Sequence, residues 1–431
     1  MPDFARSTHP AVQSQLDRLA KLSPVGDRLG LDRIAQILDR LGRPHDAIPT
    51  VFHVAGTNGK GSTCAFLRAA LEASGKSVHM FTSPHLVRFN ERIRVAGQLI
   101  EDDALAGLLA EVLAVSEDVQ PSFFEVATAT AILAFARTPA DACIIEVGLG
   151  GRLDATNVIE RPSVCGIASL GFDHQQFLGD RLPDIAGEKA GIAKRGVPLL
   201  TQLYSAPVAG RIGEIAAAVG ARWLPRGGQW DVIAERKRLR YRDGAGEFDL
   251  PLPRLPGRFQ TLNAGLAIAM LRHQTAIPVG LSCFGAAMGM TDWPARLQRL
   301  NPGPFAGERE IWIDGAHNAS AAQPVASWAK RLFSGRPLHL IFGSLQSKDS
   351  RSVLESFKQV AAHVHTVPID DHECRSPQDL VAVAAALGMQ ATAHATLDEA
   401  VAAVPAEALI LIFGSLYLAG EALAANDQVP D

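Results

Sequence analysis

Short runs of apolar residues alternate, along most of the chain, with longer stretches in which apolar positions recur at helical spacing. The short runs predict strands at Thr50–Val54, Val78–Phe81, Ala142–Val147, Val164–Ser169 and Val197–Thr201. The longer stretches predict helices, for example over Glu101–Val115 and Phe124–Ala136. Alternation of strand and helix is typical of βαβ units, so the pattern predicts a mostly parallel sheet.

The segment Arg222–Leu252 departs from this alternation. Polar and apolar residues alternate within three short pieces, Trp230–Ala234, Leu239–Arg242 and Glu247–Leu250, and turn-forming residues separate the pieces. Short strands joined by tight turns pair in an antiparallel way. We therefore expect a small antiparallel excursion on the first domain.

A domain boundary is predicted near Met290–Asn301, where prolines interrupt the helical pattern. Beyond it, strands are expected at Glu310–Ile313, Leu338–Phe342, Val364–Ile369 and Leu409–Phe413. The run Ile-Phe-Gly-Ser-Leu occurs at 341–345 and again at 412–416. This repeat predicts two strand-to-helix turns on one sheet edge; the alternative is that the recurrence is due to chance. The fold class is thus α/β. We predict a mostly parallel sheet domain at residues 1–293, followed by a smaller doubly wound, Rossmann-like domain at residues 294–431.

Composition and charge exclude several classes of protein. A net charge of −4 over 431 residues argues against a dedicated nucleic-acid binder, which would carry a basic excess. No stretch reaches the roughly 18 uncharged apolar residues that a membrane span needs. The five cysteines form no C-x-x-C pair, and the first residues lack the apolar core of a secretion signal. We expect a soluble cytoplasmic protein with reduced thiols and no nucleic-acid or membrane partner.

The run His53-Val54-Ala55-Gly56-Thr57-Asn58-Gly59-Lys60-Gly61-Ser62 carries the clearest chemical signal. It lies between a predicted strand and a predicted helix, where a glycine-rich turn lets backbone N–H groups converge on phosphate oxygens. Lys60 adds a positive charge for the outer phosphates, and a following hydroxyl can help hold Mg²⁺. The spacing departs from the common G-x-x-x-x-G-K-[ST] form. We predict a nucleoside triphosphate site; the alternative is a glycine-rich turn with an incidental lysine.

Other polar residues follow the ends of neighbouring predicted strands. Glu146 ends one strand and precedes a glycine-rich segment, and Ser83 and His174 follow two others. Carboxyl ends of parallel strands meet at one sheet edge, so these residues are expected beside the phosphate loop. Oxygen ligands suit Mg²⁺, whereas His174 alone is as consistent with a hydrogen-bonded surface histidine. Asp314-Gly315-Ala316-His317-Asn318 closes a strand of the second domain and is expected to face the same cleft.

Taken together, several motifs in one order resemble the Mur ligase superfamily, and within it the dihydrofolate synthase and folylpolyglutamate synthase family. The resemblance spans about residues 30–420. Its motifs are Ala-Gly-Thr-Asn-Gly-Lys-Gly-Ser at 55–62, Thr-Ser-Pro-His-Leu at 82–86 with Phe-Asn-Glu-Arg-Ile at 89–93, the segment 146–157, Phe-Asp-His at 172–174, Glu-Lys-Ala-Gly-Ile at 188–192 and Asp-Gly-Ala-His-Asn at 314–318. The block at 82–86 is more specific to the folate branch than to peptidoglycan ligases.

The resemblance implies roles for individual residues. For ATP, it implies that Gly59, Lys60, Gly61 and Ser62 hold the phosphates and that Asn263, Arg296 and Asp314 contact the nucleotide. For two Mg²⁺ ions, it implies that Ser83 and Glu146 are ligands of the first and that Glu146 and His174 are ligands of the second. It also implies that Lys189 is N6-carboxylated, and that the oxygens of this carbamate help hold the second ion. For the pterin substrate, it implies Ser122, Phe123, Phe124, Glu125, Leu153, Asp154 and Ala155. His317 and Ser415 are expected to handle the nucleotide or the incoming glutamate, and Lys60, Lys189 and His317 to act in catalysis.

Two positions depart from the family's pattern: Phe259 replaces a common histidine, and Ala295 replaces a usual glycine. The first bears on packing near the adenine, and the second on the stiffness of the hinge between the domains. Without the resemblance, the segment containing Lys189 is equally consistent with a charged helix end.

The activity implied is ATP-dependent amide formation with L-glutamate. We expect a monomeric bifunctional enzyme that acts on dihydropteroate and on reduced folates, its small-molecule partners. One alternative is a folylpolyglutamate synthase without dihydropteroate activity. A second, from a different class, is an ATP-binding switch or hydrolase that is not a ligase. A catalytically dead homologue would be expected to lose Lys60, Glu146 or His174, and all three are present.

Overall fold

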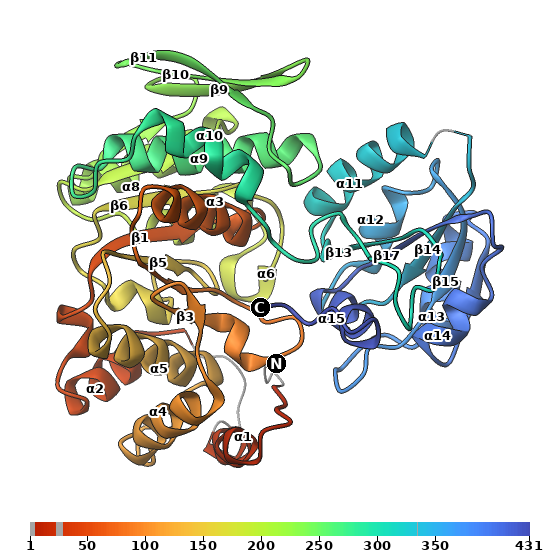
Figure 1. The fold of residues 1–431 in the computed structure, drawn as a ribbon, viewed down its shortest axis with the longest axis horizontal. Coiled ribbons are helices and arrows are strands. Elements are labelled where there is room, and N and C mark those ends of the chain that lie inside the picture. The colour runs from red at the N-terminus through yellow and green to blue at the C-terminus, as the bar shows by residue number, and fades with distance from the viewer. Residues whose placement is uncertain (1–4, 23–28, 334) are drawn as a thin grey trace.

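The computed structural model describes residues 5–22, 29–333 and 335–431. Two separate sheets, each covered by helices, form two lobes that lie side by side (Figure 1). The strands of the larger sheet come from residues 50–225, and those of the smaller from residues 298–413. We call the corresponding parts the first and the second lobe. The domain limits 1–293 and 294–431 stay predictions.

The first lobe is built on an eight-stranded sheet with the order β4-β3-β2-β5-β1-β6-β7-β8. Its strands are β1 (Thr50–Ala55), β2 (Val78–Phe81), β3 (Ile93–Val95), β4 (Gln98–Leu99), β5 (Ala142–Glu146), β6 (Val164–Ile167), β7 (Pro198–Thr201) and β8 (Arg222–Pro225). All neighbours from β2 to β8 pair in parallel, whereas β3 and β4 continue the sheet in an antiparallel way. The mostly parallel sheet predicted from the sequence is confirmed.

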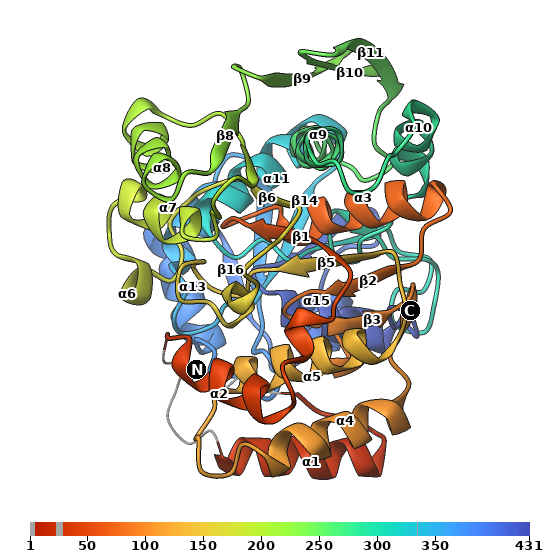
Figure 2. The ribbon, with the colours of Figure 1, turned by 90° about the vertical axis from the view of Figure 1, so that its left-hand side faces the viewer.

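Helices cover both faces of this sheet, which explains the unbroken apolar strands. In β5, Ile144 belongs to a core with helices on one face, and Cys143 and Ile145 belong to the core on the other. The first face carries α3 (Lys60–Ala73), α9 (Arg258–His273) and α10 (Leu281–Met290), and the second carries α1 (Pro10–Leu22), α2 (Asp32–Arg40), α4 (Asp102–Ala114) and α5 (Phe123–Arg137) (Figure 2). Beyond β6 lie α7 (Leu182–Ala190) and α8 (Ala206–Val219).

An antiparallel three-stranded sheet lies outside α9 and α10 (Figure 1). It contains β9 (Trp230–Glu235), β10 (Arg238–Asp243) and β11 (Gly246–Pro251). The predicted antiparallel excursion is therefore present. Its predicted start was wrong, because Arg222–Pro225 pairs in parallel with β7 as the last strand of the large sheet. This strand lies at the edge of the sheet, and only one of its four residues is fully buried. Its mixture of polar and apolar residues therefore resembles that of a hairpin strand.

The second lobe contains a six-stranded sheet with the order β12-β13-β17-β14-β15-β16. Its strands are β12 (Gln298–Arg299), β13 (Ile311–Asp314), β14 (Leu338–Phe342), β15 (Ala361–Thr366), β16 (Ala391–Ala393) and β17 (Leu409–Phe413). All pair in parallel except β12. Helices α11 (Ala319–Leu332), α12 (Ser350–Glu355), α13 (Pro377–Ala386), α14 (Leu397–Ala402) and α15 (Leu416–Ala425) surround it. The predicted doubly wound arrangement is confirmed, although β15 begins and ends three residues before the predicted Val364–Ile369.

The repeated Ile-Phe-Gly-Ser-Leu runs lie side by side, because β14 and β17 are paired with Phe342 opposite Phe413. A Cβ on Gly414 would come within 2.3 Å of the Gly343 carbonyl oxygen, so the two turns touch at one sheet edge. Within the described residues, no helix is long and apolar enough to cross a membrane.

Candidate active site in the cleft between the two lobes

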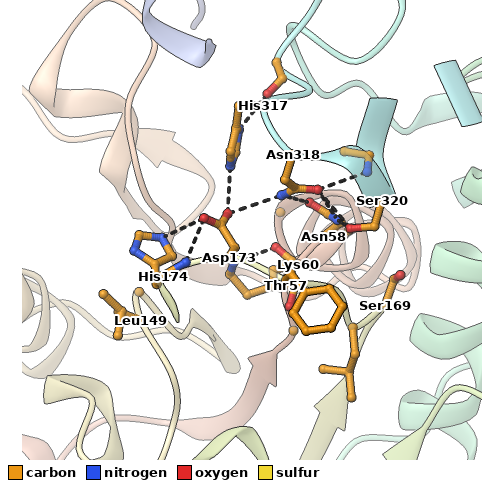
Figure 3. A pocket seen from close by; sticks show the side chains of 18 of the residues that line it. Thr57, Asn58, Lys60, Leu149, Ser169, Asp173, His174, His317, Asn318 and Ser320 are labelled. Atoms are coloured by element: carbon orange, nitrogen blue, oxygen red, sulfur yellow. Dashed lines mark hydrogen bonds and ion pairs between the residues drawn. The ribbon is translucent and has the colours of Figure 1, made fainter. Parts of the chain in front are cut away.

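A cavity of about 1290 Å³ lies between the two lobes, where their parallel strands end. The first lobe contributes the phosphate loop and the loops after β2, β5 and β6, and the second lobe contributes the segments after β13, β14 and β17. Figure 3 shows side chains from both lobes directed toward one another across this space. Small-molecule sites commonly occupy roughly 300–1,000 Å³, so this cavity has room for more than one ligand.

The phosphate loop joins the end of β1 to the first turn of α3. Gly59 occupies the N-cap position with a φ of 86°, in the left-handed region that favours glycine. A Cβ at Gly59 would lie 2.3 Å from the Asn263 side-chain oxygen, so the loop can approach α9 only without a side chain there. A helix N-terminus carries unpaired N–H groups and a partial positive charge, which favour an anion at this wall of the cavity.

Lys60 and Glu146 form an ion pair beside the phosphate loop. The Lys60 Nζ lies 3.8 Å from a Glu146 carboxylate oxygen and donates to the Thr57 carbonyl at 3.4 Å. Glu146 is 4% exposed, and its burial raises the pKa of the carboxyl group although the charge of Lys60 acts in the opposite direction. A buried carboxylate whose ion-pair partner lies 3.8 Å away is only partly compensated. A cation placed beside it would complete the compensation.

Ser83 also reaches this carboxylate, because its backbone N–H donates to Glu146 at 3.3 Å. His174 lines the same cavity, at the N-cap of α6 (Gln175–Leu178), with its side chain 42% exposed toward the cleft. No group of three or more histidine, cysteine or acidic side chains in the described ranges is arranged to hold a metal ion. A metal here would therefore need hydroxyl or ligand oxygens in addition to Glu146 and His174.

Lys189 is 4% exposed on α7 and donates from Nζ to the Gly56 carbonyl at 3.0 Å. Burial, followed by the charge of Lys60, lowers the pKa of this lysine to about 7. A lysine with its usual pKa near 10.5 has almost no neutral amine at pH 7. The lowered pKa of Lys189 makes the neutral, nucleophilic amine accessible near that pH.

A second group of polar residues lies on the same lobe, at the loop after β5. The Asp154 carboxylate accepts from the Leu149 N–H at 2.8 Å and from the Thr156 hydroxyl at 2.5 Å. Thr156 in turn is 2.9 Å from the ring of His53, which is fully buried on β1. Asp154 is therefore held rigidly at the cavity wall, next to Leu153 and Ala155, which line the cavity as well.

The start of α5 forms the neighbouring wall. Ser122 and Glu125 make a capping box, with the Ser122 N–H donating to Glu125 at 2.7 Å and the Glu125 N–H donating to the Ser122 hydroxyl at 3.2 Å. Ser122, Phe124 and Glu125 line the cavity. Phe123 does not line it; its ring packs edge-on against Phe89 instead. Successive helical residues point about 100° apart, which is why two adjacent phenylalanines face different surroundings.

Asn263, Arg296 and Asp314 also line the cavity. Asp314 ends β13 and accepts from the backbone N–H groups of Leu297 and Ala316, each at 2.8 Å. Its carboxyl group is buried, which raises its pKa, and the charge of Arg296 opposes that effect. The residue before this arginine, Ala295, has a φ of 55°, in the left-handed region that costs an alanine more than a glycine.

The second lobe reaches the first through Asp173. One carboxylate oxygen of Asp173 lies 3.1 Å from the His317 ring, and the other accepts from the Lys348 ammonium group. Although burial opposes it, the hydrogen bond from His317 and the nearby positive charges hold the pKa of Asp173 well below its usual range. His317 also lies 2.9 Å from the Gly315 carbonyl, so both of its ring nitrogens face acceptors. Ser415 lines the cavity from the N-cap of α15.

Comparison with known proteins shows to which family the chain belongs. Residues 295–416 match the family model described as Mur ligase, glutamate ligase domain. The chain is 33% identical to the dihydrofolate synthase/folylpolyglutamate synthase of Bacillus subtilis over 380 residues, which cover 82% of this chain and 84% of the relative. This chain belongs to the dihydrofolate synthase/folylpolyglutamate synthase family. It is an ATP-dependent ligase of the Mur ligase type.

Solved structures of other family members have the same fold. Escherichia coli FolC in complex with DHPP and ADP matches with a TM-score of 0.88 and 30% identity, over 98% of this chain and 99% of that one. A bifunctional folylpolyglutamate synthase/dihydrofolate synthase with Mn, AMPPNP and L-glutamate bound matches with a TM-score of 0.85 and 28% identity, over 97% and 99%.

In this family member, the structure gathers the residues singled out in the sequence around one cavity, apart from Phe123. Phe259 lines the cavity too and packs against the core of the second lobe. Four further polar residues at the site were not predicted from the sequence: Asp173, Asn58, Asn318 and Lys348. The first three lie inside the motifs at 172–174, 55–62 and 314–318, which is the signal in the sequence that points to them. Lys348 follows the first Gly-Ser turn in a loop without a recognisable pattern.

Proposed function

We propose that this enzyme adds L-glutamate both to dihydropteroate, giving dihydrofolate, and to the γ-carboxyl group of reduced folates. The observation that carries the proposal is the common cavity. Its wall contains the phosphate loop with Lys60, the rigid Asp154 region on the same lobe, and His317 on the other lobe. A nucleotide, a carboxylate acceptor and an amine can therefore meet in one space. The names and ligands of the related proteins support the two acceptors and the amino acid.

A divalent cation fits the residues beside the phosphate loop. Glu146 supplies a buried, incompletely compensated carboxylate, Ser83 a hydroxyl, and His174 an imidazole open to the cleft. The carboxylate and hydroxyl oxygens suit Mg²⁺, whereas an imidazole nitrogen is a less usual ligand for it. When bound, Mg²⁺ neutralises charge on the phosphoryl oxygens.

In the proposed reaction the acceptor carboxylate attacks the γ-phosphorus of ATP, and the bond to the β-phosphate oxygen breaks, which gives an acyl phosphate and ADP. The amine of glutamate then attacks the acyl carbon, and inorganic phosphate leaves. Two anions must approach each other in the first step. Lys60 and the N–H groups at the start of α3 lower that repulsion, because they stand where the negative charge collects.

The second step needs an amine at the acyl carbon and the exclusion of water. His317 and Ser415 belong to the second lobe, on the opposite side of the cavity from Lys60. Closing the two lobes over the ligands brings the incoming amine to the acyl phosphate and limits hydrolysis. Lys189, with a pKa of about 7, has the neutral amine that reaction with CO₂ to a carbamate requires. Its Nζ is also next to the phosphate loop, through Gly56.

Phosphate release tests the proposal. The purified protein is supplied with Mg-ATP and L-glutamate, and either dihydropteroate or tetrahydrofolate is added; Lys60→Ala serves as the inactive control. Turnover with both acceptors supports the bifunctional enzyme. Turnover with tetrahydrofolate alone selects a folylpolyglutamate synthase without dihydropteroate activity. Release that needs neither acceptor nor glutamate would instead identify an ATP hydrolase or switch.

A further inference from the structure

A pair of asparagine side chains joins the phosphate loop to the second lobe. The Asn58 amide nitrogen donates to the Asn318 side-chain oxygen at 3.0 Å, and the Asn318 amide nitrogen donates back to the Asn58 oxygen at 3.1 Å. The two residues are 260 positions apart in the chain. Figure 3 shows them facing each other across the cleft, between the phosphate loop and the start of α11.

The remaining amide hydrogens of this pair also have partners across the cleft. Asn58 donates its other hydrogen to the Ser320 hydroxyl at 2.9 Å, and Asn318 donates its other hydrogen to Asp173 at 3.2 Å. The Asn318 oxygen accepts from the Ala321 N–H at 3.0 Å as the N-cap of α11. Both amide groups are thus fully used as donors. We call Asn58, Asn318, Ser320 and Asp173 the interlobe clasp.

The backbone around the clasp is shaped to allow this contact. The Asn58 N–H donates to the Ser169 carbonyl at 3.1 Å, which holds the phosphate loop against the segment after β6 and leaves the side chain directed outward. In that segment, a Cβ on Gly171 would lie 2.1 Å from the Ser320 hydroxyl. Only glycine at this position lets the first turn of α11 come so close.

The clasp also fixes the position of His317, which lines the cavity. His317 directly precedes Asn318, and its ring contacts Asp173, which belongs to the clasp. On the other side of the pair, Asn58 is two residues from Lys60. Hydrogen bonds between side chains therefore set how far His317 stands from the phosphate loop.

We propose that the interlobe clasp is a positioning device which couples the two steps of the ligase reaction. It holds the lobes closed while the acyl phosphate exists, so that glutamate and not water reaches the acyl carbon. This inference rests on the proposed function. With the clasp broken, water attacks the acyl carbon, the carbon–oxygen bond to phosphate breaks, and the acceptor carboxylate and inorganic phosphate are regenerated without an amide.

The test compares phosphate released with amide bond formed, at saturating ATP and acceptor. Asn58→Ala removes three interlobe hydrogen bonds, and Asn318→Ser removes the amide while keeping an N-cap hydroxyl. Three bonds of ordinary net strength correspond to roughly a hundredfold change in an equilibrium. We expect amide formation to fall by about tenfold to a hundredfold. Phosphate release should fall less, so that phosphate per amide rises several-fold.

Two further variants and one control sharpen the test. Gly171→Ala replaces no clasp residue but pushes Ser320 away from Asn58, and should raise the same ratio. The double variant of Asn58 and Asn318 should be little worse than either single variant, because both act through one contact. Ser376→Ala removes a helix cap of the same kind from α13, and should leave the ratio unchanged.

The outcomes separate this proposal from the proposed function. Wild-type protein without glutamate-dependent turnover would contradict the function itself. Wild-type turnover, with variants whose phosphate and amide fall in equal proportion, would show that the clasp only supports the fold and would overturn the coupling role. Unchanged amide formation in Asn58→Ala would overturn it as well.

Discussion

Replacing Lys189 with methionine is expected to stabilise the protein and to abolish its activity. Lowering a lysine pKa from 10.5 to about 7 corresponds to a burial cost of about 5 kcal/mol when the unfolded chain is fully charged. At pH 7 about 4 kcal/mol of this cost is present. Methionine has a similar length and no charge, but it loses the hydrogen bond to Gly56, with a net value of about 1–2 kcal/mol. The expected gain in unfolding free energy is therefore about 2–3 kcal/mol at pH 7.

The gain has a defined dependence on pH. The unfolded chain keeps the Lys189 proton up to a pH near 10.5, whereas the folded chain releases it near pH 7. Between these values the unfolded state binds more protons, so the stability of the wild type rises with pH relative to Lys189→Met. The advantage of the variant should shrink with rising pH, vanish between about pH 9 and pH 10, and then reverse slightly, because the hydrogen bond to Gly56 is still missing.

Thermal unfolding in metal-free and CO₂-free buffer measures this difference. A gain of 2–3 kcal/mol corresponds to a rise in Tm of roughly 5 °C for a domain of this size. Lys358→Met, at an exposed lysine, is the matched control and should not change Tm. An equal or lower Tm for Lys189→Met at pH 7, or a difference that stays constant up to pH 10, would refute the burial argument.

Four more predictions follow from individual contacts. Lys60→Ala should keep the fold and lose at least about a thousandfold in turnover, because it removes charge neutralisation at the phosphoryl group; near-normal ligation by the folded variant would contradict that role. Thr156→Val removes the hydroxyl that donates to Asp154, and should lower kcat/KM for the pteroate acceptor by roughly thirtyfold in steady-state assays. Burial and the neighbouring histidines lower the pKa of His365 to about 3. The folded protein therefore keeps His365 neutral while the unfolded chain takes up a proton, so stability is full above pH 6.5 and falls as the pH drops toward 3. In His365→Gln, the Tm should fall less steeply over that pH range than in the wild type. Ala295→Gly relieves a positive φ but removes a buried methyl group and loosens the unfolded chain, so the unfolding free energy should change by less than about 1 kcal/mol in denaturant titrations.

The local part of the site could be predicted from the sequence. The phosphate loop, with Lys60 and Gly59, consists of consecutive residues between a strand and a helix, so its geometry depends on short-range backbone rules. Glu146 could be placed for a related reason. It ends an apolar strand, and parallel strands bring their carboxyl ends to one edge of the sheet.

The rest depended on packing between distant segments. Phe123 and Phe124 are adjacent in the sequence, yet only Phe124 reaches the cavity, because the rotation of α5 against its neighbours decides which ring faces inward. The strand at Arg222–Pro225 was missed because its exposed edge weakens the apolar pattern. In each case the structure is decided by contacts with residues far away in the sequence, which local patterns do not reveal.

The sequence by itself determined the two α/β lobes, the phosphate loop and the edge of each sheet at which the cavity lies, since these follow from periodicity and strand direction. Tertiary structure alone decided that Lys189 loses its proton near neutral pH, because desolvation depends on everything that surrounds the amine. It alone joined Asn58 to Asn318 as well, since a hydrogen bond between residues 260 positions apart forms only after both lobes have folded and met.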